Sequence, residues 1–451
     1  MRKRISAFFS VLAAIVLLTV PASAASSGST LKIICADAGQ VIFTPPGSTQ
    51  YAYRYGPAIL IDGDRIDIWA SAPPLVSNGV RYGNDSIEYI RSTDGGKTWT
   101  EWKTVLYPTL NSEDQWSTCD PGAFKYGDYY YVGYTGSPEF RTNPDKEKQV
   151  NNLFIARAKN PEGPYEKWNG NGWGGDPYAI TRYSGDGVGC SMPSFTVKGD
   201  TLYMYYVDQT HPDQDWNSEG NISVSTFSLK DPNWPGNELS NKMCENKPEE
   251  VRYCPDIDKF IGFQLKGGWD YDSYVEIYES TDGVNFTKTS SFRNNFPHYA
   301  HNIGISGNNL GQLDLSIQNY IGTAYTPTGV EAWWGHWHTQ LIPLYIREEQ
   351  PSSTTSSQPS GSTDSSSQKP TTSSVGSTDG KSSETEVSEP QNSNIESTVS
   401  DNKDKDKEVN NKTEQQEETS YLWLYIVIGA VVVLAGAGTA VYFLVIKKKH
   451  V

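Results

Sequence analysis

Three side chains that could exchange protons stand where strand-like runs begin. Asp120 precedes Pro121 at the opening of one run, Glu250 opens a second, and His301 opens a third. In general acid–base catalysis one such group takes a proton from water while another gives a proton to the leaving oxygen. We expect Asp120 to be the base and His301 or Glu250 to be the acid. For each of them, the alternative interpretation is a turn residue or a cap that bonds a neighbouring backbone group.

Four further side chains at strand ends could hold a ligand. They are Arg54, Trp116, Asp208 and Trp334. Aromatic faces stack on sugar rings, and an Arg side chain binds hydroxyl or carboxylate groups. Paired carboxyl groups are the usual machinery of glycosidic cleavage. The predicted partner is therefore a glycan or oligosaccharide, although Asp208 could equally be a strand-end cap.

A recurring pair of strands would bring these residues together. In one copy, residues 123–126 and 129–134 are rich in aromatic and β-branched residues and flank a Gly-Asp turn. The other copies pair residues 56–61 with 65–70, 192–197 with 201–207, 251–253 with 260–264, and 301–305 with 320–325. Copies recur every ~45–70 residues, which is consistent with four-stranded propeller blades that carry loops. The sequence predicts an all-β fold, a five-bladed β-propeller whose inner strands begin on the face that carries the central pocket.

Residues 92–99 (STDGGKTW) form the most specific local motif, an Asp-box, and residues 279–286 (ESTDGVNF) form a degenerate second copy. In this motif Asp and Gly build a hairpin turn, and the aromatic ring packs back under the blade. Asp94 could be read as a catalytic acid. We favour the interpretation as a structural turn on the outer strands of a blade.

Several segments resemble the five-bladed propeller of glycoside hydrolase family 43 and its relatives. They are Asp120-Pro121, residues 156–158 with 162–165, and residues 300–304. The Asp-boxes, and Arg54 ahead of Pro57, are instead similar to sialidases. The resemblance covers the predicted propeller and implies a glycosidase.

The chain also departs from the family that it resembles. Family 43 enzymes use three acids from successive inner strands, but here Gly56 and Met192 stand at the openings of two of those strands. The related α-neoagarobiose hydrolases pair an Asp with a His acid. That arrangement would suit Asp120 and His301, and the resemblance leaves both pairings open.

Outside the predicted propeller the chain changes in character. Residues 1–24 have the basic start, apolar run and small-residue cleavage site of a signal peptide, and the folded part should occupy residues 30–347. Residues 350–420 are Ser/Thr-rich and then acidic, which predicts a disordered stalk. Residues 421–446 are an uncharged apolar run long enough to form a transmembrane helix, and the basic residues 447–451 predict a cytoplasmic tail. We expect a single-pass protein of the cell membrane with its ectodomain outside.

The amino-acid composition limits the classes of molecule that this protein could bind. A formal net charge of −16 argues against nucleic acid. The five cysteines show no C-x-x-C spacing and no His-rich metal spacing accompanies them, so we expect neither a metal nor a cofactor. Cys244 and Cys254 could pair across a short loop, or all five could be buried thiols.

Two classes of function compete. One is a surface glycoside hydrolase, exo-acting because the pocket of a propeller is a blind funnel. The other is a non-catalytic glycan-binding adhesin on the same fold. A sialidase-like hydrolase is a further alternative, although Arg54 alone is well placed for it. We favour the hydrolase, because a pure binder has no need of a charged acid–base pair such as Asp120 and His301.

Overall fold

The computed structural model describes residues 29–46, 52–143, 146–182, 188–210, 220–327 and 336–349, without the side chains of 140–149. All of them belong to the unit Met1–Ser357. The predicted signal peptide, stalk, transmembrane helix and tail, and also Trp334, lie outside the described residues. Within these ranges no helix is long and apolar enough to cross a membrane.

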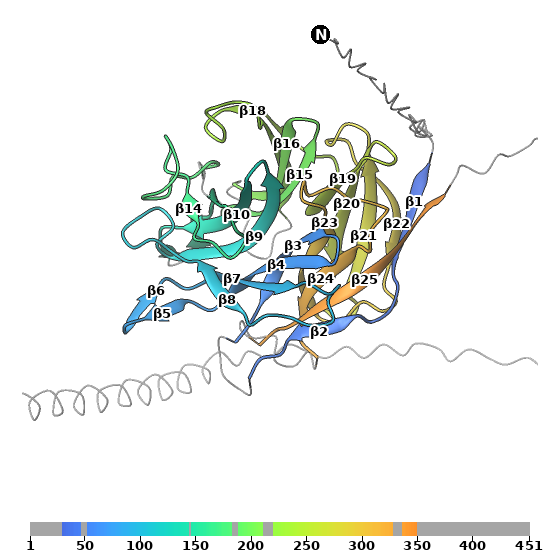
Figure 1. Ribbon diagram of the computed structural model, residues 1–451, viewed down its shortest axis with the longest axis horizontal. Coiled ribbons are helices and arrows are strands. Elements are labelled where there is room, and N and C mark those ends of the chain that lie inside the picture. The colour runs from blue at the N-terminus through green and yellow to red at the C-terminus, as the bar shows by residue number, and fades with distance from the viewer. Residues whose placement is uncertain are drawn as a thin grey trace, which may run out of the picture. The chain divides into compact units, whose positions relative to one another are not determined.

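The described strands form five blades of four antiparallel strands each, which we number 1 to 5 (Figure 1); three blades are separate four-stranded sheets, and blades 1 and 5 are joined in one nine-stranded sheet. From the inner to the outer strand, blade 1 contains β3 (Tyr55–Asp62), β4 (Arg65–Ala72), β7 (Ser86–Ser92) and β8 (Lys103–Leu106), and blade 2 contains β9 (Ser117–Tyr126), β10 (Tyr129–Ser137), β13 (Asn152–Ala158) and β14 (Glu166–Lys167). Blade 3 contains β15 (Gly189–Lys198), β16 (Thr201–Gln209), β17 (Asn221–Ser228) and β18 (Glu238–Met243), and blade 4 contains β19 (Glu250–Cys254), β20 (Lys259–Lys266), β21 (Tyr274–Ser280) and β22 (Thr287–Phe292). Blade 5 contains β23 (Ala300–Gly307), β24 (Tyr320–Tyr325), β25 (His338–Glu349) and β1 (Thr30–Cys35), and β2 (Gln40–Phe43) also pairs with β25. Two small hairpins, β5–β6 (Leu75–Ser77, Val80–Tyr82) and β11–β12 (Phe140–Asn143, Lys146–Gln149), extend from the loops between second and third strands.

The five inner strands close into a ring. Neighbouring inner strands are in contact from β3 through β9, β15 and β19 to β23, and β23 pairs in parallel with β3. Two glycines allow the closest approaches: a Cβ on Gly122 would lie 1.9 Å from the Pro193 carbonyl oxygen, and a Cβ on Gly304 would lie 1.6 Å from that of Pro57. The predicted all-β propeller and its five strand pairs are therefore confirmed.

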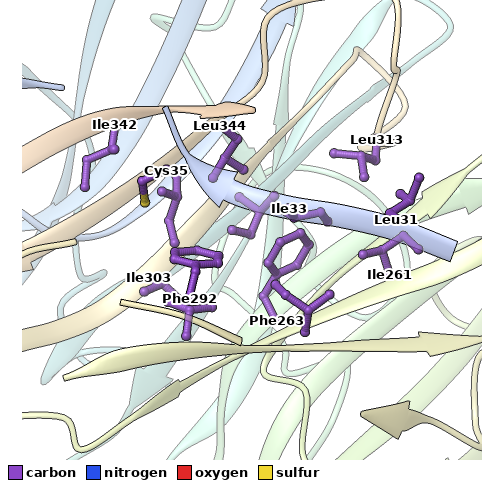
Figure 2. Close-up of a cluster of buried hydrophobic side chains, with 14 of the residues drawn as sticks. Leu31, Ile33, Cys35, Ile261, Phe263, Phe292, Ile303, Leu313, Ile342 and Leu344 are labelled. Atoms are coloured by element: carbon purple, nitrogen blue, oxygen red, sulfur yellow. The ribbon is translucent and has the colours of Figure 1, made fainter. Parts of the chain in front are cut away.

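The first strand of the chain completes the last blade. In Figure 1, β1 lies along the outer edge of β25, with Ile33 opposite Ile346. Figure 2 shows Ile33 above Phe263 and Leu31 above Ile261, both of blade 4, in the hydrophobic core between blades 4 and 5. The repeat pattern had not predicted this strand, because its partner lies more than 300 residues away in the sequence.

Polar contacts fasten the same strand to blade 4. The Leu31 amide donates to Glu279 Oε1 at 2.8 Å, and Lys259 Nζ donates to the Ser29 carbonyl oxygen at 2.6 Å and to Glu279 Oε2 at 2.7 Å. Two hydrogen bonds thus tie the start of the chain to blade 4, and their partners Lys259 and Glu279 are themselves paired within that blade.

The Asp-box segments are turns between outer strands. Asp94 accepts hydrogen bonds from the Thr98 amide at 2.9 Å and the Thr98 hydroxyl at 2.6 Å, and these bonds lower its pKa to about 2. Asp282 accepts the equivalent bonds from the backbone of Val284 and Asn285. Ser92 pairs with Ile66, at the far end of blade 1 from the start of β3. This geometry fits the structural interpretation of Asp94.

Candidate functional site

Four inner strands begin with the same local distortion. Gly56, Asp120, Met192 and Asn302 have φ values of 57°, 48°, 57° and 57°, in the left-handed region, and the strand pairing shifts register at each of them. Such bulges re-aim side chains and are common beside functional sites. In blade 4, β19 pairs with β20 without a shift.

The distorted residues converge on the axis of the propeller. A Cβ placed on Gly56 would lie 3.5 Å from Asp120 Oδ1 of the next blade. Met192 Sδ of blade 3 lies 3.6 Å from Asn302 Nδ2 of blade 5. Blade 4 separates these two in the ring, so their side chains meet across the centre. Asn302 Oδ1 is buried and has no hydrogen-bond partner among the described residues.

Asp120 is held in place by the hydroxyl groups of second strands. Its amide donates to Ser71 Oγ at 2.7 Å, and the Thr135 side chain hydrogen-bonds its carboxylate while accepting the Met192 amide at 2.9 Å. Burial raises the pKa of Asp120 to about 6; the hydrogen bonds from Thr135 and Cys119 act against this shift, and the charge of Asp85 adds to it. A carboxyl group with such a pKa can both hold and release a proton near neutral pH.

A second carboxyl group, Asp85, lies behind Asp120. It is buried and accepts hydrogen bonds from the Tyr53 hydroxyl at 2.5 Å and the Ser117 hydroxyl at 2.8 Å. Our sequence analysis missed Asp85 because it considered only the ends of first and second strands, whereas Asp85 immediately precedes β7, a third strand. Its position at the opening of that strand was the available signal.

Aromatic rings surround His301 beside this carboxyl pair. The ring centroid of His301 lies 4.2 Å from that of Trp337, 4.4 Å from Trp269 and 5.5 Å from Tyr55. Burial raises the pKa of the Tyr55 phenol, and the charges of Asp85, Cys119 and Asp120 add to this shift, so Tyr55 lies near both carboxyl groups. We call this largely buried cluster of Tyr55, Trp269, His301 and Trp337 the aromatic cup; Tyr55 and Trp337 are almost inaccessible to solvent, and Trp269 is its most exposed ring.

The electrostatics of His301 differ from those of a proton donor. Burial lowers its pKa to about 3, so the imidazole is neutral near neutral pH. A neutral imidazole cannot deliver the proton that the sequence analysis expected of it. The structure therefore favours a positioning role for His301 over the predicted role as acid.

Glu250 lies deeper along the axis. Its Oε2 contacts Arg252 Nη2 at 2.8 Å and Ser194 Oγ at 3.2 Å, and Arg252 donates in turn to the Ile305 carbonyl oxygen at 2.6 Å and 3.0 Å. Ser194 and Ile305 come two and three residues after Met192 and Asn302 along their strands. Burial raises the pKa of Glu250, while the guanidinium of Arg252 acts in the opposite direction.

The remaining predicted ligand-binding residues are placed differently. The guanidinium of Arg54 pairs with Glu88 and lies over the ring of Phe43 at 4.6 Å, so its charge is already used within the protein. Asp208 accepts bonds from the Thr210 hydroxyl at 2.7 Å and from Ser223 at 3.2 Å, which corresponds to the strand-end cap.

Trp116 is half-buried immediately before β9, where its amide donates to the Ser137 carbonyl oxygen at 2.9 Å. Trp334 cannot be placed, because it lies outside the described residues. Trp337, in contrast, lies in the aromatic cup. Tyr55 thus contacts His301 and lies near Asp120, whereas Arg54 and Asp208 are in other contacts.

All five cysteines are buried and unbridged, so Cys244 and Cys254 do not pair. Across the described part of the chain, no group of three or more His, Cys, Asp or Glu side chains is arranged to hold a metal ion.

No family model matches the sequence, and no curated protein matches it. Solved structures with a similar chain trace include an α-L-arabinofuranosidase from Podospora anserina in complex with cellotriose, at 12% identity over 71% of this chain and 98% of that chain, with a TM-score of 0.47. A family 117 glycoside hydrolase of the marine bacterium Zobellia galactanivorans is 15% identical over 71% of this chain and 90% of that chain, with a TM-score of 0.45. The GH43_1 enzyme from Xanthomonas citri complexed with xylose is 12% identical over 67% and 90%, with a TM-score of 0.45. These three are glycoside hydrolases, the class that the sequence motifs resemble.

Proposed function

We propose that this protein binds a glycan at the centre of the propeller and hydrolyses a glycosidic bond there. The observation that carries the proposal is Asp120: its carboxyl group has a pKa of about 6 and lies beside the aromatic cup of Tyr55, His301, Trp269 and Trp337. Sugars present apolar ring faces and hydroxyl edges, which such a combination of rings and polar groups binds.

In the proposed reaction Asp120 takes a proton from a water molecule. The water oxygen then bonds to the anomeric carbon while the bond from that carbon to the leaving oxygen breaks, and an acid gives the leaving oxygen a proton. Glu250 is the candidate acid, since burial favours its protonated form. His301 and the more exposed Trp269 would position the sugar ring, and Asn302 Oδ1 would accept a hydrogen bond from a hydroxyl group.

We place this activity outside the cell. Export by residues 1–24, anchoring by residues 421–446 and a stalk between anchor and propeller would hold the site at the cell surface. A blind pocket at the centre of the propeller would accept only the end of a glycan, which supports exo-action.

A specific observation favours a second candidate, a non-catalytic glycan receptor. Gly56 and Met192 occupy the same bulge position as Asp120 in the neighbouring blades and carry no acid. The ion pair with Arg252 also favours the charged form of Glu250, which could not donate a proton. Nothing comparable favours a sialidase, because Arg54 is engaged by Glu88.

Turnover separates the two candidates. The purified full-length protein would be incubated with a panel of aryl-glycosides and oligosaccharides, beside Asp120→Asn and the control Asp200→Asn, which alters an exposed turn residue paired with Lys230. Release of product by the parent and the control, but not by Asp120→Asn, supports the hydrolase. Retention on a glycan array by all three proteins without any product would favour the receptor. If the parent neither binds a glycan nor releases a product, the proposal is contradicted.

A further inference from the structure

The loop between β20 and β21 presents two exposed aromatic rings on a rigid backbone. Trp269 and Tyr271 are 39% and 57% exposed. Arg293 holds the loop by donating to the carbonyl oxygens of Tyr271 and Ser273, both at 2.8 Å, and Ser273 Oγ donates to the Gly267 carbonyl oxygen, also at 2.8 Å. Large rings fixed in solvent offer contact area with little loss of conformational entropy on binding.

These two rings point to different neighbours. Trp269 contacts His301 and Trp337 of the aromatic cup, with ring centroids 4.4 Å and 5.2 Å apart. Tyr271 stacks on His298, with centroids 3.8 Å apart and ring planes inclined by 18°. The loop therefore presents an aromatic ledge, defined by Trp269 and Tyr271, between the central cup and His298.

A cavity of about 350 Å³ lies at the outer end of this ledge. Its lining includes Asn295, Phe296, His298, Tyr325, Thr326 and Gln340. The cavity is close to the centre as well, because Tyr325 pairs with Ala300, and the preceding Ala324 pairs with His301. This volume falls within the range of small-ligand pockets, roughly 300–1,000 Å³.

The chemistry of the cavity selects a neutral, hydroxyl-rich ligand. None of its lining residues is an Asp, Glu, Lys or Arg, so it offers no full charge to an ionic group. Amide and hydroxyl groups alternate with the flat faces of aromatic and proline rings. Thr326 is 3% exposed, and its Oγ1 finds no hydrogen-bond partner within the described ranges. A buried hydroxyl in that state is available to a ligand.

We propose that the ligand is an extended neutral oligosaccharide that runs from Asp120 over Trp269 and Tyr271, with a further sugar unit in the cavity at Thr326. This inference rests on the proposed function at the centre and adds the length and the charge of its substrate. The ledge supplies ring faces for stacking, and the cavity supplies hydrogen bonds to hydroxyl groups.

Affinity as a function of chain length tests the inference. The titrations would use neutral oligosaccharides of one to five units, taken from a series that the parent binds. Four full-length proteins would be compared: the parent, Tyr271→Ala, Thr326→Val and the control Tyr345→Ala, which removes an exposed ring from β25. For the parent we expect affinity to rise with length. Tyr271→Ala and Thr326→Val should each weaken binding of the longest ligands about tenfold, leave the shortest ligand unchanged and leave turnover of short aryl-glycosides intact.

The outcomes separate this inference from the proposed function. Binding of short ligands whose affinity does not rise with added units would overturn the proposal of an extended ligand, but not the proposed function. An equal loss of affinity for ligands of all lengths in Tyr271→Ala and Thr326→Val would do the same. A requirement for a charged unit would also overturn it. No binding of any oligosaccharide by the parent would overturn both proposals.

Discussion

Met192 and Asn302 meet across the axis of the propeller, with Sδ and Nδ2 3.6 Å apart, although blade 4 separates their strands in the ring. Both residues occupy the left-handed bulge position that Asp120 occupies in blade 2. Glu250, in contrast, contacts Ser194 and pairs with Arg252, which bonds Ile305; Ser194 and Ile305 come two and three residues further along the same strands. The two carboxyl groups expected to act together therefore lie at different depths, and each should affect stability through its own burial and contacts.

Asp120 should make stability depend on pH. Since burial raises its pKa to about 6, ionising it costs more in the folded protein than in the unfolded chain, where its pKa is about 3.9. This cost is absent below about pH 4, grows towards pH 6 and is complete above it. Near neutral pH, the free energy of unfolding of Asp120→Asn should accordingly exceed that of the parent by at most about 3 kcal/mol, and its melting temperature should be higher. At about pH 4 the two proteins should melt at the same temperature. Melting temperatures across this range check the prediction, and a difference that does not vary with pH would contradict it.

Glu250 should be structurally required. Removing it leaves the buried guanidinium of Arg252 without its partner, which costs about 3–5 kcal/mol for a buried ion pair. Glu250→Ala should therefore lower the free energy of unfolding by that amount in urea titrations. The matched control is Glu166→Ala, whose partner Arg157 lies 3.2 Å away at the surface and whose loss should cost at most about 1 kcal/mol. Equal effects of the two substitutions would refute the buried-pair interpretation.

The closing strand offers a test on two adjacent residues. Ile33 is 1% exposed and belongs to the core between blades 4 and 5, whereas Ile34 is 38% exposed on the same strand. Ile33→Ala should destabilise the protein by about 2–5 kcal/mol, and Ile34→Ala by only about 0.5 kcal/mol. Denaturant unfolding of both variants measures the difference. Similar losses would mean that β1 is not packed as the structure has it.

The aromatic rings of the two Asp-boxes should contribute unequally to stability. Phe286 is fully buried in the core of blades 3 and 4, while Trp99 is half-buried. Phe286→Ala should cost about 3–5 kcal/mol and Trp99→Ala less, because a partly exposed ring loses less burial. Both variants should keep the affinity of the parent for glycans, since these turns lie at the end of the blades away from the aromatic cup. A stable Trp99→Ala protein that has lost glycan binding would show that the motif serves the site.

Local pattern was enough to predict the fold. Alternating aromatic and β-branched runs around turns such as Gly127-Asp128 encode paired strands, because side-chain alternation and turn chemistry act over a few residues. Five such pairs imply a ring of blades. The prolines that follow Gly56, Asp120 and Met192 marked the openings of inner strands, and so the sequence also pointed to Asp120 as a residue of the central face.

Tertiary structure alone decided the partners of each charged group. The sequence shows that Arg54 and Glu250 lie near strand ends, but not that Arg54 pairs with Glu88 of β7. Nor does it show that Ser194 and Ile305, from the two neighbouring blades, hold Glu250 and Arg252 in place, because these contacts depend on how strands and blades pack. Burial likewise determined the protonation of His301, which has an ordinary pKa in an unfolded chain and a pKa of about 3 among three aromatic rings. The same packing placed β1 beside β25, a pairing that no local pattern in the sequence encodes.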